Sequence, residues 1–331
     1  MLGGMNVDSK TKYPIHVPDI QKIFRAAGFP GVCKIHPLGA GMYNAVYEVC
    51  TNEKSYVIKI APPSEVPVMT YERDIMRAEL YWYRQMREKT GIRVPEIYVQ
   101  DFDHRIIPAD YFIMEKLDGK QFDQMDFTPQ EKVEASSQLA KMAAQIHRIR
   151  NDRFGYIQNE LCENWYQAVR RMVSNIIQDA ARLGKRTRRG ERLLQAIDRY
   201  QSVLEKAECC MVNFDIWAPN ILCIRGDQGI EYAWIDPERS FWGDRIADFV
   251  CLEMSKPLRE KKKSLTAYNG ISDHPVAATW EEEIRLAVAQ GYLALIQEVE
   301  KYYRYTPWNQ GWWLDVFSSR YFYNKAFGVL Q

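Results

Sequence analysis

The chain has 331 residues, of which 47% are hydrophobic and 26% charged, and its formal net charge is +1. This length suits two lobes better than one core, and the charge excludes a general attraction to nucleic acid or membrane. No apolar stretch reaches the roughly 18 residues of a membrane span, and the N-terminus has no signal-like segment. The seven cysteines lack metal-type spacing, so we expect reduced thiols in a cytoplasmic protein.

The first third of the chain predicts strands around one helix. Alternating apolar residues, with a short glycine turn at Gly39–Gly41 and a second turn near residues 51–54, are typical of a hairpin. The predicted strands lie within residues 33–50, 54–61, 94–100 and 110–119.

A helix is predicted over residues 70–89 and should end before Gly91. Its apolar stripe contains Ile75, Glu79, Trp82 and Met86. A charge in the middle of an apolar face normally has a partner, so we expect Glu79 to form an ion pair. Glu72 is the competing candidate for the same partner.

From about residue 121 the pattern favours helices. They are predicted within residues 129–149, 163–183, 189–207 and 279–303, the last with a capping box of Thr279 and Glu282. The basic run 184–192 is interpreted as a solvated loop. Strands followed by helices predict an α+β fold with an N-terminal lobe over 1–116 and a helical lobe over 117–331.

The segment NFDIWAPNILC, residues 213–223, places Asp215 five residues before Asn220 and just ahead of an apolar strand. Residues 221–225 and 231–236 read as a hairpin. Pairing Arg225 with Glu231 would set its register, because opposite charges across a strand pair are favourable, and would place Asn220 opposite Asp236.

A carboxamide and a carboxylate at the open end of one hairpin suit Mg²⁺, which prefers hard oxygen ligands and keeps part of its shell for substrate phosphates. Asp215, in the loop before the hairpin, is then available to accept a proton from an attacking hydroxyl. This arrangement is typical of phosphoryl transfer by kinase-like enzymes.

The motifs DIWAPN, WID and WGDRIAD, which begin at residues 215, 234 and 242, resemble the aminoglycoside phosphotransferase and choline kinase family. The resemblance implies a two-lobed protein-kinase-like fold, a nucleotide (ATP, or GTP as the alternative) with Mg²⁺, and a small-molecule hydroxyl acceptor. It implies Asp215 as catalytic base and Asn220 and Asp236 as metal ligands. Monomer or homodimer are both compatible with it, and no nucleic acid or membrane partner is expected.

The resemblance extends more weakly to the first lobe. PLGAGMYNAVYEV resembles a phosphate-covering loop, which implies nucleotide contacts for Gly39 and Gly41. Lys59 resembles the lysine on the nucleotide phosphates, with Glu79 as its helix partner. The segment from Met114 through Glu115 to Lys116 resembles the linker between the lobes, where backbone groups would meet adenine.

The chain departs from the family pattern directly before the base. Asn213 and Phe214 stand where the family usually has His and Gly. A catalytically inactive, nucleotide-binding module on the same fold is therefore the alternative from another class. His147, Asp244 and Asp248 are interpreted as structural residues, and the two aspartates are candidates to anchor the catalytic loop or to cap a helix.

Aromatic residues concentrate near the C-terminus: Trp308, Trp312, Trp313, Phe317, Tyr321 and Tyr323. At helical spacing such residues usually belong to the core, which we favour here. The other interpretation is a cation–π box for a quaternary amine. The sequence does not choose among an aminoglycoside, a choline or ethanolamine, and a sugar amine as acceptor.

Overall fold

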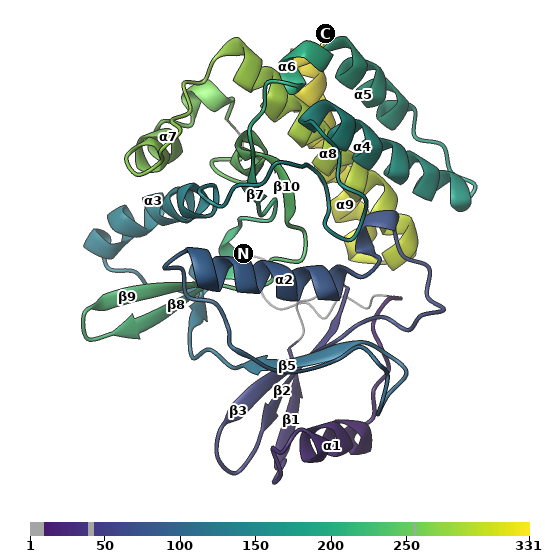
Figure 1. Ribbon diagram of the computed structural model, residues 1–331, viewed down its shortest axis with the longest axis vertical. Coiled ribbons are helices and arrows are strands. Elements are labelled where there is room, and N and C mark those ends of the chain that lie inside the picture. The colour runs from purple at the N-terminus through teal and green to yellow at the C-terminus, as the bar shows by residue number, and fades with distance from the viewer. Residues whose placement is uncertain (1–9, 39–42, 255) are drawn as a thin grey trace. The chain divides into compact units, whose positions relative to one another are not determined.

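The computed structural model describes residues 10–38, 43–254 and 256–331 (Figure 1). The chain forms two compact units: one contains residues up to Met69 with Pro95–Asp118 and Glu300–Asp315, and the other contains Thr70–Val94, Gly119–Val299 and Val316–Gln331. One boundary between the units falls after Asp118. The division into functional lobes at 116/117 stays a prediction. Gly39 and Gly41 lie outside the described residues.

In the described part of the first unit, five antiparallel strands form one sheet in the order β1-β2-β3-β5-β4. The strands are β1 (Lys34–Pro37), β2 (Ala45–Cys50), β3 (Ser55–Ile60), β4 (Ile97–Asp101) and β5 (Tyr111–Glu115). Helix α1 (Val17–Ala26) places Ile20, Ile23 and Phe24 in the apolar core with residues of this sheet. The predicted hairpin and both further strands are confirmed.

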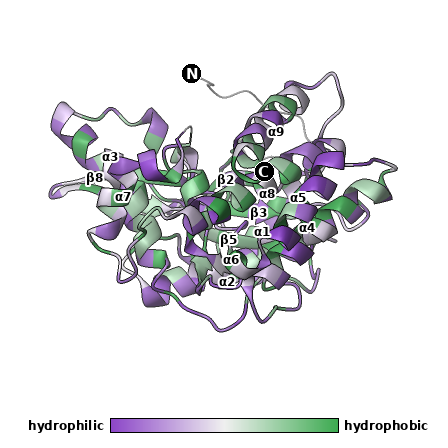
Figure 2. Ribbon diagram, turned by 90° about the horizontal axis from the view of Figure 1, so that it is seen from above, coloured by the Kyte–Doolittle hydropathy of each residue, from purple (hydrophilic) through white to green (hydrophobic). Residues whose placement is uncertain are grey.

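The second unit contains most of the helices (Figure 1). The helices of the described chain beyond α1 are α2 (Ile75–Lys89), α3 (Pro129–Ile146), α4 (Trp165–Arg182), α5 (Arg188–Arg199), α6 (Gln201–Leu204), α7 (Lys262–Asn269), α8 (Trp280–Arg304) and α9 (Gln310–Val329). Short 3₁₀ turns are η1 (Thr70–Glu72), η2 (Phe122–Gln124), η3 (Ala218–Asn220), η4 (Arg245–Val250) and η5 (Leu258–Glu260). Hydrophilic and hydrophobic residues alternate along α4 and α5 (Figure 2), as expected of amphipathic helices.

Two small sheets of the second unit carry the motifs. β7 (Cys209–Val212) pairs with β10 (Phe241–Asp244), and β6 (Lys120–Gln121) pairs with β8 (Ile221–Gly226), which pairs with β9 (Gly229–Trp234). The loop between β7 and β8 holds the predicted base. The segment between β9 and β10 holds Asp236. All three of these strand pairs are antiparallel.

The predicted register of the β8–β9 hairpin is wrong by one residue. Arg225 pairs with Ile230, and Glu231 pairs with Ile224. A two-residue turn closes the hairpin at Gly226 and Gly229, and turn length fixes register more strongly than one exposed charge pair does. The Arg225 guanidinium instead pairs with Glu131 at the N-terminus of α3.

The predicted stripe of α2 is confirmed, since Ile75, Glu79, Trp82 and Met86 are all buried. Glu72, however, lies in η1, separated from α2 by Asp74 in a left-handed conformation. The basic run is not a loop throughout, because α5 already begins at Arg188.

The capping box of α8 is confirmed by hydrogen bonds from Thr279 N to Glu282 Oε2 (3.0 Å) and from Glu282 N to Thr279 Oγ1 (3.2 Å). Within the described residues, no helix has the length and apolar character needed to cross a membrane.

Candidate active site

The loop after β7 is anchored by a buried carboxylate. Asp248, in η4, accepts the backbone N–H of Asn213 at Oδ2 (3.1 Å) and that of Phe214 at Oδ1 (2.6 Å). Asp248 is fully buried. Its position explains the second aspartate of WGDRIAD, and the interpretation of Asp248 as a loop anchor is confirmed.

The anchor is itself supported. His147, at the C-cap of α3, lies with Nε2 2.8 Å from Asp248 Oδ2 and with Nδ1 2.8 Å from the Tyr268 hydroxyl. All three side chains are buried. Asp244 accepts the N–H of Ile246 and so caps η4. The structural interpretation of His147 and Asp244 is therefore also confirmed.

Asp215 follows at the surface of this anchored loop, half-buried. Its N–H donates to Asn213 Oδ1 (3.0 Å). Asn220 Nδ2 donates to the Asp215 carboxylate at Oδ2 and to its backbone carbonyl, both at 3.1 Å. The five-residue spacing thus brings the predicted base and the predicted amide ligand into direct contact.

Asp236 lies in a cluster of three carboxylates. One carboxylate oxygen from each of Glu79, Asp236 and Glu238 lies within 4.8 Å of the others. The backbone N–H of Asp236 donates to the Tyr83 hydroxyl (2.8 Å), so two residues of α2, four apart, meet this segment. The arrangement concentrates hard oxygen donors around Asp236.

Glu238 and Tyr83 were not predicted from the sequence. The sequence does contain a signal for Tyr83, because it follows Glu79 by one turn of helix α2 and therefore lies on the same face. Glu238 carries none, because its contact depends on the turn that follows β9, where Asp236 has a φ of 61°. Asn220 does not lie opposite Asp236, as the predicted register required: with the register shifted by one residue, its backbone carbonyl accepts the N–H of Ile235 (2.9 Å), the residue before Asp236.

Cysteine chemistry does not compete at this loop. The Cys251 sulfur lies 3.9 Å from the Phe214 carbonyl oxygen. Burial, with the charge of Asp215 as a smaller cause, raises the pKa of the Cys251 thiol far above its ordinary value. A protonated thiol is a weak nucleophile, so we do not assign Cys251 a chemical role.

The predicted nucleotide residues of the first unit lie on neighbouring strands. Lys59 is buried on β3, with its Nζ 6.0 Å from the centroid of the Phe112 ring. Met114 and Glu115 end β5, and Lys116 follows. The Glu115 N–H donates to the Glu96 carbonyl (2.8 Å) and is therefore already used within the sheet. The pairing of Lys59 with Glu79 stays a prediction.

The aromatic residues near the C-terminus divide into two groups. Tyr323 is buried, and Trp312 packs edge-on against Tyr302 with a ring separation of 5.1 Å. Four others are exposed: Trp308, Trp313, Phe317 and Tyr321. The core interpretation thus holds for Tyr323 and is wrong for these four.

Another exposed tryptophan lies in the loop between β7 and β8. The side chain of Trp217 is 45% exposed, although its neighbour Ile216 is fully buried. The Trp217 N–H donates to the Asp215 carbonyl (3.0 Å). An indole that stays in water two residues from the predicted base is a candidate to contact a substrate.

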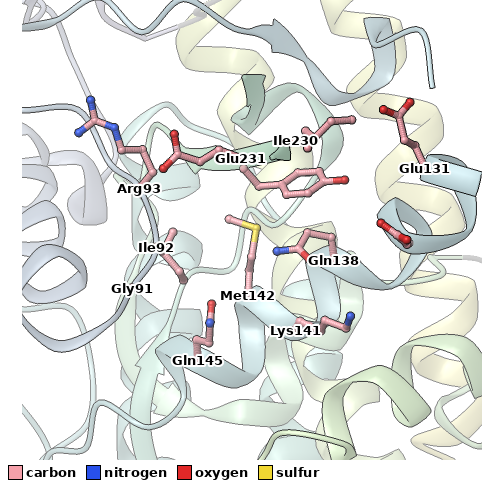
Figure 3. Close-up of a pocket in the computed structure, with 13 residues that line it drawn as sticks. Gly91, Ile92, Arg93, Glu131, Gln138, Lys141, Met142, Gln145, Ile230 and Glu231 are labelled. Carbon is pink, nitrogen blue, oxygen red and sulfur yellow. The ribbon is translucent and has the colours of Figure 1, made fainter. Parts of the chain in front are cut away.

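A polar pocket of about 450 Å³ lies elsewhere in the second unit, between α3 and β9 (Figure 3). Gln138, Lys141, Met142 and Gln145 line it from α3, and Ile230 and Glu231 from β9. Asp215, Asn220 and Asp236 are not among its lining residues, so we do not assign it to the chemistry.

The sequence matches the model of the phosphotransferase enzyme family over residues 34–289. No curated protein matches it. A solved structure from Ralstonia eutropha JMP134, provisionally described as an aminoglycoside phosphotransferase, is 15% identical with a TM-score of 0.64, covering 95% of this chain and 98% of that one.

Two further structures are similar. One from Haemophilus somnus 129PT, provisionally described as a fructosamine-3-kinase, is 16% identical with a TM-score of 0.64, covering 92% of this chain and 96% of that one. The ternary complex of APH(2″)-IIa with streptomycin and ATP is 17% identical with a TM-score of 0.59, covering 93% and 97%. At these identities the likeness shows the fold.

The family model spans well over half of the chain, and the structural likeness spans nearly all of it. The α+β, protein-kinase-like fold expected from the motifs is therefore confirmed, with an antiparallel sheet in the N-terminal region and helices in the C-terminal region. The chain belongs to the phosphotransferase enzyme family.

Proposed function

We propose that this enzyme transfers the γ-phosphoryl group of ATP to a hydroxyl group of a small molecule and that the reaction requires Mg²⁺. The observation that supports this most strongly is the catalytic loop, where Asn220 holds the Asp215 carboxylate while Asp248 fixes the backbone. Phosphoryl transfer depends mainly on positioning and charge stabilisation, which such a loop provides. The similar structure that holds ATP supports the choice of nucleotide, with GTP as the alternative.

Asp215 is the proposed general base. The acceptor hydroxyl gives its proton to the Asp215 carboxylate while its oxygen bonds to the γ-phosphorus. The bond from that phosphorus to the bridging oxygen breaks, and ADP leaves. Asn220 supports this role, because its N–H group fixes one carboxylate oxygen and thereby the direction of the carboxylate.

Asn220 and Asp236 are the proposed Mg²⁺ ligands, and the donor set fits this ion. The amide nitrogen of Asn220 is used by Asp215, which leaves its carbonyl oxygen for a metal, and Asp236 lies among further carboxylates. When bound, Mg²⁺ neutralises phosphate charge and orients the nucleotide. Glu79 and Glu238 make the surroundings of Asp236 more negative, which favours a cation.

The nucleotide is proposed to bind the first unit. Lys59 would neutralise phosphate charge, with Glu79 fixing its position, and Gly39 and Gly41 would allow the backbone to approach the phosphates. Because the Glu115 N–H bonds to Glu96, we propose that the remaining backbone groups between Met114 and Lys116 meet adenine.

The acceptor is proposed to be a hydroxyl compound of the aminoglycoside type, with choline, ethanolamine or a sugar amine as the alternatives. The similar structures include complexes with streptomycin and gentamicin and a protein described as a fructosamine-3-kinase. The exposed ring of Trp217 supports an acceptor that presents a flat ring face or a cationic amine beside Asp215.

The proposal also covers the cellular compartment and the assembly of the enzyme. All seven cysteines are free thiols, which supports a reducing cytoplasmic compartment. We propose a monomer or a homodimer as the working assembly.

The experiment that tests the function is ADP release from ATP with Mg²⁺ against a panel of amino sugars, macrolides, choline and fructosamines. We expect acceptor-dependent ADP release that EDTA abolishes. Nucleotide binding without turnover for any acceptor would instead favour the inactive module that the unusual Asn213 and Phe214 suggest.

A further inference from the structure

Three consecutive backbone N–H groups of the catalytic loop are used, but not by the same partner. Those of Asn213 and Phe214 donate to Asp248, whereas that of Asp215 donates to Asn213 Oδ1 at 3.0 Å. Asn213 therefore folds its side chain over its own loop, in the manner of an Asx turn. Through this hydrogen bond, Asn213, which Asp248 anchors, contacts the proposed base Asp215.

The orientation of the Asn213 amide is fixed by chemistry. Only its carbonyl oxygen can accept an N–H group, so the carbonyl must face Asp215. The side chain is fully buried, and its Nδ2 makes no hydrogen bond to any described residue. A buried donor without a partner lowers stability. At this position the amide nitrogen therefore lowers stability, while the carbonyl oxygen of the same amide accepts the N–H of Asp215.

Phe214 holds the turn that makes this contact. Its φ of 61° is left-handed, a conformation that residues with a Cβ adopt at an energetic cost. Its ring is 2% exposed, with centroids 5.3 Å from Phe241 and 5.5 Å from Tyr292. The aromatic packing offsets the cost and fixes the peptide between Phe214 and Asp215.

We propose that Asn213 is a positioning residue for catalysis: its side-chain carbonyl holds the Asp215 N–H and so fixes the backbone from which the Asp215 carboxylate extends toward Asn220, while Phe214 holds the left-handed turn between Asn213 and Asp215. This rests on the proposed role of Asp215 as general base. A loop with Asn213 and Phe214 in place of the family's usual His and Gly is then compatible with catalysis. A small displacement of a base is costly for the rate, so the effect should appear in kcat.

The test compares Asn213→Ala with Asn213→Ser, by ADP release from MgATP with the acceptor panel above and by hydrogen exchange of the loop amides. Alanine removes the acceptor, so kcat should fall by about tenfold or more, the KM for ATP should change less than about threefold, and exchange at Asp215 should accelerate. Serine keeps an oxygen that can accept the same N–H and removes the buried Nδ2. It should recover most of kcat and restore protection.

The matched control is Asn164→Ala. Asn164 Oδ1 accepts the N–H of Gln167 (2.9 Å) at the N-cap of α4, so this variant loses the same kind of bond outside the loop. It should lower the melting temperature and leave kcat unchanged. Unchanged kcat and exchange in Asn213→Ala, or a serine variant as impaired as the alanine variant, would overturn the inference. Full transfer by Asp215→Asn would instead overturn the role of Asp215 as the base, on which this inference rests, whereas the absence of acceptor-dependent ADP release in the wild type would overturn the proposed function.

Discussion

The motif with Asp215 and Asn220 could be recognised from the sequence because both residues lie in one six-residue stretch, and the structure places Asn220 Nδ2 3.1 Å from Asp215 Oδ2, while their roles stay predictions. Trp217 and Glu238 could not. The exposure of Trp217 and the turn after β9 that brings Glu238 close to Asp236 follow from no pattern in the sequence. The departures at Asn213 and Phe214 were recognised, but only the contacts show how they support the loop.

Trp217→Ala tests the acceptor side of the loop. The indole is half exposed and bonds to the loop only through its backbone, so its removal should cost little stability. We expect the KM for the acceptor to rise about tenfold, consistent with the loss of roughly 1–2 kcal/mol of ring or cation–π contact, while the KM for ATP stays constant. Equal effects on both KM values would show that Trp217 merely shapes the loop.

Lys59→Ala tests the nucleotide side. Lys59 is a buried cation on β3, and buried charges require a partner, which we propose to be Glu79 and the nucleotide phosphates. The variant should fold, as judged by circular dichroism, and should bind ATP at least tenfold more weakly in calorimetry, at roughly 1.4 kcal/mol per factor of ten. Unaltered ATP affinity would return Lys59 to the role of a packed strand residue.

The elements follow their sequence patterns closely, with exceptions that have physical reasons. The stripe of α2 and the capping box of α8 are local signals, and both are confirmed. The register of the β8–β9 hairpin failed because the charge of Arg225 was assigned to the wrong partner. A helix distant in sequence, α3, supplies that partner through Glu131, and no local pattern reveals it.

Arg225→Ala tests this contact. The hydrogen bond from Arg225 is the largest cause that lowers the pKa of Glu131 from 4.5 to about 2. A carboxyl whose folded pKa is lowered stabilises the fold above its unfolded pKa, and this stabilisation is lost as pH falls toward the folded value. In urea unfolding, the variant should be less stable at pH 7, and its difference from the wild type should shrink below about pH 4.5.

Glu231→Ala is the control for that series, since Glu231 is the partner that the predicted register assigned to Arg225. Its stability should match the wild type within error across the same pH range. A loss in Glu231→Ala equal to that in Arg225→Ala would restore the predicted pairing.

For the whole molecule, the change from strands to helices along the chain was sufficient to predict the α+β class, and the resemblance of the motifs to a known family implied the kinase-like fold. The sequence did not reveal that the compact units are discontinuous. Helix α2 belongs with the second unit, where Trp82 packs against Trp242 with ring centroids 4.9 Å apart. Such contacts join segments about 160 residues apart, beyond the reach of periodicity and capping signals.

Asp236→Ala tests whether Asp236 binds the proposed Mg²⁺, through the stability of the whole chain. A ligand that binds only the folded chain raises its stability by about 2.7 kcal/mol at a hundredfold excess over Kd. ADP with Mg²⁺ should therefore raise the melting temperature of the wild type, and ADP with EDTA should raise it less. Asp236→Ala should lose the Mg²⁺-dependent part. A full Mg²⁺-dependent shift in this variant would move the metal site away from Asp236.

The most direct measurement of the central claim is the kcat and the KM for ATP of Asp215→Asn, with the acceptor that the panel identifies. Asparagine keeps the shape of the side chain and a carbonyl for Asn220, but it cannot take the proton of the acceptor hydroxyl. We predict a fall in kcat by a factor of about 10² to 10⁴ with a nearly unchanged KM for ATP, because the lost interaction belongs to the transition state. A variant that retains the full kcat would contradict the assignment of Asp215 as the base.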